Sequence, residues 1–101
     1  MSDVNKVILV GRLGAAPETR TSAAGKSFVR FSLATSLGHG ESRSTDWHQV
    51  RAFGKTAELC GKYLTKGQLC MIEGRLSYHT FDKDGQKSSF TSVLADAVHF
   101  I

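Results

Sequence analysis

The sequence contains little cysteine and little proline, and it has no long hydrophobic run. Its 101 residues include two cysteines and one proline. Cys60 and Cys70 form no CxxC pair and have no histidine at metal-ligand spacing, which favours two buried thiols in a reducing compartment over a disulfide or a zinc site. With so little proline, no proline-rich linker divides the chain, so we expect one domain over residues 1–101.

Signals for membrane insertion and export are also missing. No apolar run approaches the roughly 20 residues that a membrane helix needs. The first residues, MSDVNK, lead directly into a strand-like stretch, which argues against a signal peptide. These absences predict a cytoplasmic protein with no membrane partner.

Catalytic and metal-binding motifs are absent as well. The four histidines are scattered, without HxH or HExxH spacing, and no GxSxG, P-loop or dinucleotide-binding glycine pattern occurs. Asp82 and Asp84 flank Lys83 in a turn-like segment and are typical of turn residues rather than of an acid–base pair. We therefore expect no enzyme, no metal and no cofactor.

The charge balance favours an anionic partner. Thirteen Lys and Arg residues face nine Asp and Glu residues, which gives a net charge of +4. A basic surface is one sign of nucleic-acid binding, although many basic proteins bind no polyanion.

Alternation and turn residues predict five strands and one helix. The strands are expected over residues 4–13, 26–36, 46–53, 68–78 and 90–101. The helix is expected over residues 55–67, with Thr56 as its N-cap, and residues 79–88 should form a hairpin tip around Asp84 and Gly85. Three strands, a helix and two strands are typical of the OB-fold, an all-β, five-stranded Greek-key barrel that binds oligonucleotides.

The strand at 46–53 places aromatic and polar side chains on one face. At a period of two, this face carries Trp47, Gln49, Arg51 and Phe53. Two aromatic rings spaced by a hydrogen-bonding group and a cation can stack nucleobases and neutralise phosphate, and such stacking contributes about 1–3 kcal/mol per base in proteins that bind single strands. The alternative is that Trp47 and Phe53 close the barrel or lie in a subunit interface, and this segment alone leaves both interpretations open.

Further aromatic and basic residues favour the nucleic-acid interpretation. Tyr78 and Phe81 flank the hairpin that contains Lys83 and Lys87, although Phe81 could instead pack beneath its own loop. The outward face of the second strand adds an aromatic–cation pair, Phe28 and Arg30. Five more basic residues, each unremarkable alone, are Lys6, Arg12, Lys55, Lys66 and Arg75.

Several stretches resemble the bacterial single-stranded DNA-binding protein family. They are VNKVILVGRLGAAPETR, FSLATS, DWHQVRAFGKTAE, YLTKGQ and IEGRL, in an order nearly collinear from residue 4 to residue 101. The resemblance implies that Trp47, Phe53 and Phe81 stack bases and that Lys6, Lys55 and Lys66 lie near the bound strand. It also implies a homo-oligomer, either a dimer or a tetramer, whose interface residues are His48, Val4, Lys6 and Ile8.

The sequence departs from the family pattern in two places. After LATS the family commonly has another stacking tryptophan, whereas this chain offers only Leu37 and His39, so one stacking position is weakened. Family members usually continue into an acidic tail that recruits replication and repair enzymes. This sequence stops at HFI, so we expect any replication or restart partner to be recruited by another route.

The expected function is sequence-independent binding and protection of single-stranded DNA in replication, recombination or repair, in the nucleoid of the cytoplasm. No residue distinguishes RNA from DNA, and the resemblance favours DNA. One alternative is a tailless restart factor similar to primosomal replication protein N. An alternative of another class is a protein-interaction module whose basic face docks an acidic partner.

Overall fold

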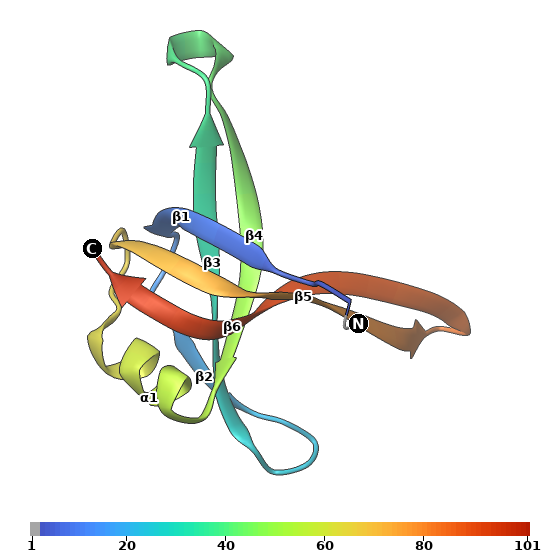
Figure 1. Cartoon of the computed structure of the whole chain (residues 1–101). Helices are drawn as coiled ribbons and strands as arrows, with labels where there is room; N and C mark the ends of the chain where they lie inside the picture. Colours follow the sequence, from blue (N-terminus) through green and yellow to red (C-terminus); the bar gives the residue numbers. More distant parts are fainter. Residues whose placement is uncertain (1–2) are drawn as a thin grey trace.

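The structure is a computed structural model that describes residues 3–101. Within that range the elements in chain order are β1 (Val7–Leu13), β2 (Glu18–Thr21), β3 (Ser27–Leu37), the 3-10 turn η1 (Gly40–Ser42), β4 (Ser44–Phe53), α1 (Gly54–Tyr63), β5 (Leu69–Lys83) and β6 (Gln86–Phe100) (Figure 1). No helix in the described part is long and apolar enough to cross a membrane.

Five of the strands close into a barrel. The strand order is β1-β5-β6-β4-β3-β2, and a further antiparallel pairing between β1 and β3 joins the ends of the first five. The β4–β6 pairing is parallel, and the other pairings are antiparallel. These features confirm the predicted OB-fold barrel with a helix before its last two strands.

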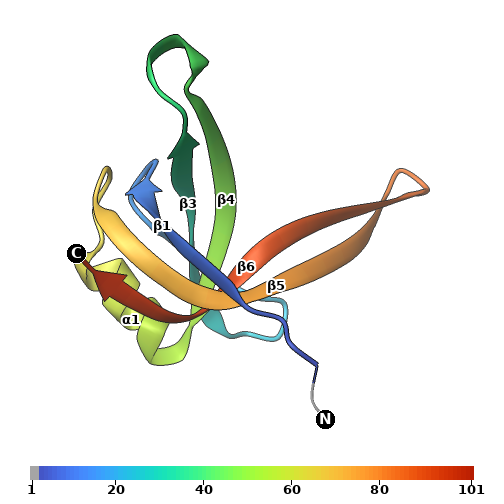
Figure 2. The same ribbon diagram turned by 45° about the horizontal axis from the view of Figure 1, so that its top comes forward.

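Two long hairpins extend from the barrel as arms. Figure 2 shows that β3–β4 and β5–β6 leave the barrel in different directions and diverge toward their tips. The turn between β5 and β6 has positive φ angles of 53° at Asp84 and 77° at Gly85, as a two-residue type I′ hairpin requires. The predicted turn is therefore confirmed, but both strands run to it, so most of the predicted loop at residues 79–88 is strand.

The core lies between the inward faces of the strands and one side of α1. Val29, Phe31 and Leu33 of β3 point into it, as their alternation predicts. Val50 and Ala52 of β4 are completely buried. Ala57 and Cys60 contribute the buried side of α1, and burial raises the pKa of the Cys60 thiol to about 11, with a smaller contribution from Cys70.

Two predictions for the N-terminal strands were wrong. The sheet has a sixth strand, because β2 lies in the segment predicted as a loop; its four residues are all exposed, so no buried alternation marked it. β1 begins at Val7 rather than at residue 4.

The helix predicted over residues 55–67 was also four residues too long at the C-terminus and had the wrong N-cap. α1 begins at Gly54, and its N-cap residue is Phe53, which makes no side-chain cap bond. The Thr56 hydroxyl instead donates toward the Asp96 carbonyl oxygen at 3.5 Å. α1 ends at Tyr63 because Leu64 turns to extended backbone, and Gly67 then donates its N–H to the Leu13 carbonyl oxygen at 2.8 Å.

Candidate nucleic-acid interface

The outward face of the β3–β4 ladder places the predicted residues opposite one another. The cross-strand pairs are Phe28 with Phe53, Arg30 with Arg51, Ser32 with Gln49 and Ala34 with Trp47. The Trp47 side chain is 58% exposed, whereas Val50 and Ala52 on the opposite face are buried. The alternation thus holds, and one strip of sheet presents aromatic, amide and guanidinium groups to solvent.

Aromatic rings from both arms meet around the Arg51 guanidinium group. Phe28 and Phe53 stack with their ring centroids 5.2 Å apart. The Arg51 guanidinium carbon lies 5.4 Å from the Phe28 ring and 5.2 Å from the Phe90 ring, so the cation sits between them. Such contacts fix the long Arg51 side chain while its N–H groups remain available to an anion.

The aromatic contacts continue along the β5–β6 arm. Phe90 stacks on His79 with centroids 4.9 Å apart, and it lies 6.0 Å from Phe81. We call the connected set the aromatic ridge; its members are Phe53, Phe28, Arg51, Phe90, His79 and Phe81. The contact between Phe81 and Phe90 means that Phe81 does pack within its own hairpin, yet its ring also stays substantially exposed.

Sequence reasoning missed Phe90 and His79 as members of the ridge. The signal that could have found them is the register of the hairpin, because a two-residue turn at 84–85 pairs Lys83 with Gln86 and therefore His79 with Phe90. The same register places Phe81 and Lys83 on the face that carries Phe90, and Tyr78 and Lys87 on the opposite face. Tyr78, 69% exposed, therefore does not belong to the ridge.

Trp47 stands apart from the ridge and packs against Gly14. A Cβ atom at Gly14 would come within 2.5 Å of the indole Cζ3 atom, so only glycine allows the ring this position. A cavity of about 250 Å³ separates Trp47 from the β5–β6 arm and is lined on that side by Leu76 and Thr91. Gln49 lines this cavity and also a second one, of about 160 Å³, that reaches Arg51 and Phe90. Two neighbouring cavities that share Gln49 as a lining residue thus lie between Trp47 and the ridge.

The predicted cations differ in how freely they can contact an anion. A carboxylate oxygen of Glu18 accepts hydrogen bonds from an Arg20 nitrogen at 2.9 Å and from the Arg30 Nε atom at 3.3 Å. These bonds lower the pKa of the Glu18 carboxyl group, and the bond from Arg20 has the larger effect. Part of the Arg30 charge is therefore already neutralised. Within the described residues, Arg51 forms no ion pair with a carboxylate.

The remaining basic candidates are dispersed around the molecule. Lys55 lies in the first turn of α1, two residues beyond Phe53. Lys6, Lys66 and Arg75 line none of the cavities described above. Lys6 instead forms an ion pair with Glu73, with 3.6 Å between its Nζ atom and a carboxylate oxygen.

The segment that follows LATS contains no tryptophan, phenylalanine or tyrosine. Leu37 ends β3 as an exposed side chain, and the backbone carbonyl of His39 accepts a hydrogen bond from the Ser42 hydroxyl at 2.9 Å in the tip of the arm. Beyond Trp47 along this arm, the structure therefore offers only the smaller imidazole ring of His39.

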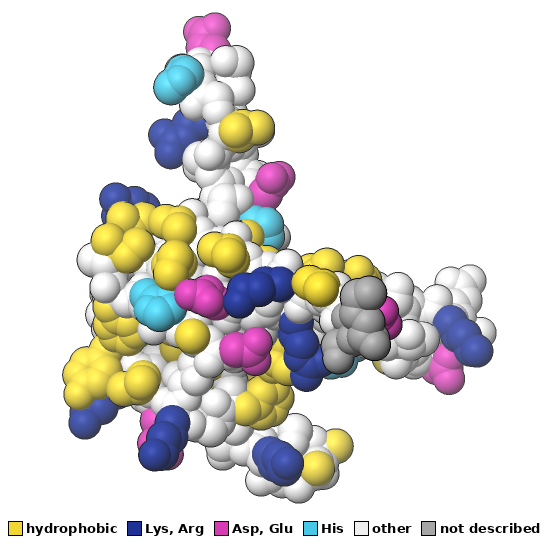
Figure 3. Space-filling model, viewed as in Figure 1, with side chains coloured by type: hydrophobic (Ala, Val, Ile, Leu, Met, Phe, Trp, Pro, Cys, Tyr) yellow, Lys and Arg dark blue, Asp and Glu magenta, His cyan; other side chains and the backbone are white. Residues whose placement is uncertain are grey.

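The predicted interface residues lie at two places. Val4 is 89% exposed and Ile8 is 60% exposed, both at the N-terminal end of the chain. Hydrophobic side chains gather over β1 and the neighbouring strands in Figure 3. His48 is half-buried, and its Nε2 atom lies 2.9 Å from the Thr35 hydroxyl on the neighbouring strand, which gives it a partner within its own chain.

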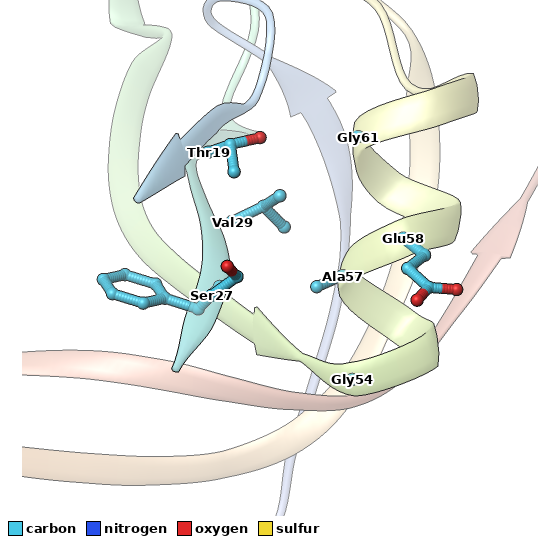
Figure 4. Close-up of a pocket in the computed structure, with 8 residues that line it drawn as sticks. Thr19, Ser27, Val29, Gly54, Ala57, Glu58 and Gly61 are labelled. Atoms are coloured by element: carbon cyan, nitrogen blue, oxygen red, sulfur yellow. The ribbon is translucent and has the colours of Figure 1, made fainter. Parts of the chain in front are cut away.

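A cavity of about 450 Å³ between α1 and the β2–β3 hairpin does not suit a polyanion. Figure 4 shows Val29 and Ala57 within it and the Glu58 carboxylate on the helix side. Thr19 and Ser27 add hydroxyl groups, but none of the residues that line the cavity is a cation. A phosphate group would therefore meet a negative charge and apolar walls here.

Comparisons with known proteins identify a matching family, similar sequences and a similar structure. The profile described as "Single-strand binding protein family" matches residues 4–101. The chain is 44% identical over 98 residues to single-stranded DNA-binding protein 1 of Chlorobaculum tepidum, covering 90% of this chain and 60% of that protein. It is 40% identical over 105 residues to the single-stranded DNA-binding protein of Xylella fastidiosa, covering 97% of this chain and 63% of that protein. The chain thus spans about three-fifths of the length of these curated relatives.

A solved structure shares the whole architecture. The chain resembles the one described as "Plasmodium falciparum SSB complex with ssDNA" with a TM-score of 0.86 and 25% identity, covering 100% of this chain and 97% of that one.

Proposed function

The chain belongs to the single-strand binding protein family, and on this premise we propose that it binds single-stranded DNA without regard to sequence and protects it during replication, recombination or repair. The observation that carries the proposal is the aromatic ridge, with Arg51 between Phe28 and Phe90, and the two neighbouring cavities between this ridge and the exposed Trp47. A family named for single-strand binding also agrees with the expectation of a binding protein rather than an enzyme.

The mechanism is stacking combined with charge neutralisation. Bases of an unpaired strand stack on Trp47, Phe53 and Phe81, with Phe28 and Phe90 extending the surface between them. Arg51 and neighbouring basic side chains contact phosphates and release counterions. A duplex binds poorly because its bases are already stacked and paired, and the absence of base-edge readout makes binding independent of sequence.

Several finer points belong to the same proposal. We assign residues 1–101 to one binding domain that acts in the cytoplasm, on DNA of the nucleoid. Of the basic candidates, Arg30, Lys55 and Lys83 lie beside the ridge in sequence or register, and the dispersed Lys6, Lys66, Arg75 and Lys87 are secondary contacts. The comparisons name single-strand binders and do not favour the restart-factor alternative or a protein-interaction module.

Fluorescence anisotropy of a labelled oligo(dT) tests the proposed function. We expect tight binding of the single strand, weak binding of a duplex of equal length, and a linear fall of log K with log salt. An oligo(U) competitor measures the preference between DNA and RNA. Equal affinity for the duplex would contradict the stacking mechanism, and absence of binding would contradict the function.

We propose that the chain forms a homo-oligomer through the exposed apolar side chains Val4 and Ile8. An Ile8→Asp substitution should reduce the mass measured by sedimentation equilibrium, because a carboxylate in an apolar interface loses its hydration. The matched control is Leu37→Asp, which changes an equally apolar exposed side chain away from β1. An unchanged mass for folded Ile8→Asp would remove β1 from the interface.

His48→Ala tests the second predicted position in the same way, but it also removes the bond to Thr35.

A further inference from the structure

A second cavity at Trp47 lies over the seam between β1 and β3, at the base of the β3–β4 arm. Its volume is about 370 Å³. Arg12 and Arg43 contribute two guanidinium groups to its wall, and Ser36 and Thr45 contribute two hydroxyl groups. No carboxylate lines it, in contrast to the cavity beside α1. Its chemistry therefore suits a group that is anionic at one end and aromatic at the other.

One hydrogen bond fixes an arginine of this cavity before any ligand arrives. An Arg12 Nη1–H group donates to the Gly67 carbonyl oxygen at 3.1 Å, and Arg12 forms no ion pair with a carboxylate among the described residues. The Trp47 indole lies against Gly14, where an added Cβ atom would come within 2.5 Å of its Cζ3 atom. A prearranged guanidinium group loses less entropy on contact with phosphate, and its planar fork matches two phosphate oxygens.

The floor of the cavity lies on the β1–β3 seam. It includes Gly11, which lacks a side chain because the Ala34 carbonyl oxygen lies only 2.2 Å from the place where its Cβ would be. Trp47 is the wall that this cavity shares with the hollow leading toward the β5–β6 arm. A strand that runs along the ridge can therefore continue past the indole and into this cavity.

We propose that this cavity binds one nucleotide of the single strand, with its base against Trp47 and its phosphate between Arg12 and Arg43. The inference rests on the proposed function, which it extends beyond the ridge by a defined phosphate contact. It also gives the β3–β4 arm a role at its base.

The test compares salt dependence among charge-matched variants. We expect the Arg12→Gln/Arg43→Gln double variant to bind oligo(dT) about tenfold more weakly, since hydrogen bonds to a charged group are being lost. The slope of log K against log salt should become less steep by about 0.7, the value for one phosphate of a single strand. The control is Lys26→Gln/Lys62→Gln, which removes the same charge from residues that line none of the cavities at Trp47.

The outcomes separate this inference from the function on which it rests. If the wild type and the control bind and the arginine variant binds as the control does, the phosphate clamp is wrong and the function stands. If the wild type itself does not bind, the function fails as well. An Arg12→Lys/Arg43→Lys variant keeps the charge, so it should recover the slope; failure to recover it in a protein of unchanged thermal stability would also contradict the clamp.

Discussion

Replacing Trp47 with alanine should weaken the binding of oligo(dT) by about 1–3 kcal/mol, or roughly five- to 150-fold, which is the range for losing one base-stacking aromatic side chain in single-strand binders. The indole is more than half exposed and lies between two cavities. Its removal therefore deletes a stacking surface without opening the core. Anisotropy titrations of wild type and Trp47→Ala at one salt concentration measure the difference.

A matched control is available on the other side of the molecule. Tyr63 is another exposed aromatic residue, at the end of α1, where it packs edge-on against Phe100 with centroids 6.1 Å apart. Tyr63→Ala should leave oligo(dT) affinity unchanged. If both variants lost affinity equally, or if folded Trp47→Ala bound normally, Trp47 would not be a stacking platform.

The second large effect is on stability: alanine should destabilise the protein at Gly11 and stabilise it at Gly61. A Cβ atom at Gly11 would lie 2.2 Å from the Ala34 carbonyl oxygen, across the β1–β3 seam that closes the barrel. Backbone cannot yield as a flexible side chain does, so Gly11→Ala should lower the free energy of unfolding by at least about 1–3 kcal/mol. Thermal unfolding should then occur about 4–8 °C lower for each kcal/mol.

The Gly61→Ala substitution makes the same chemical change in a permissive place. Gly61 lies in α1, and its added Cβ would meet only the Val29 side chain, at an ordinary 3.6 Å. Alanine favours the helix over glycine by up to about 1 kcal/mol, so this variant should melt at a higher temperature than wild type. A Gly11→Ala variant as stable as wild type would contradict the seam geometry, and a destabilised Gly61→Ala variant would contradict the permissive position in α1.

The inward and outward faces of the barrel strands could be predicted because period-two alternation is strong where one face is buried. In β3, for example, the alternation predicts that Val29, Phe31 and Leu33 face inward. It predicts that Phe28 and Arg30 face outward, and the structure places each as expected. The sixth strand could not be predicted in this way. β2 lies at the edge of the sheet, and all four of its side chains are exposed, so hydrogen bonding alone defines it.

The candidate site was predictable along β4 and less so on the β5–β6 arm. Trp47 and Phe53 stand out because two aromatic rings share an otherwise polar face. Phe90 gives no such signal, since its role depends on the Arg51 guanidinium group that reaches it from another strand. Contacts of this kind depend on how two hairpins cross, and a hydrophobic pattern along one strand contains no information about that crossing.

The intrinsic fluorescence of Trp47, titrated with oligo(dT), tests the central claim most directly. The chain contains one tryptophan, so the emission reports on this site alone. Stacking predicts strong quenching by the single strand, little quenching by a duplex of equal length, and a loss of quenching as salt is raised. Unchanged emission from a folded protein at saturating oligo(dT) would contradict the account, because the strand could not then be stacked on Trp47.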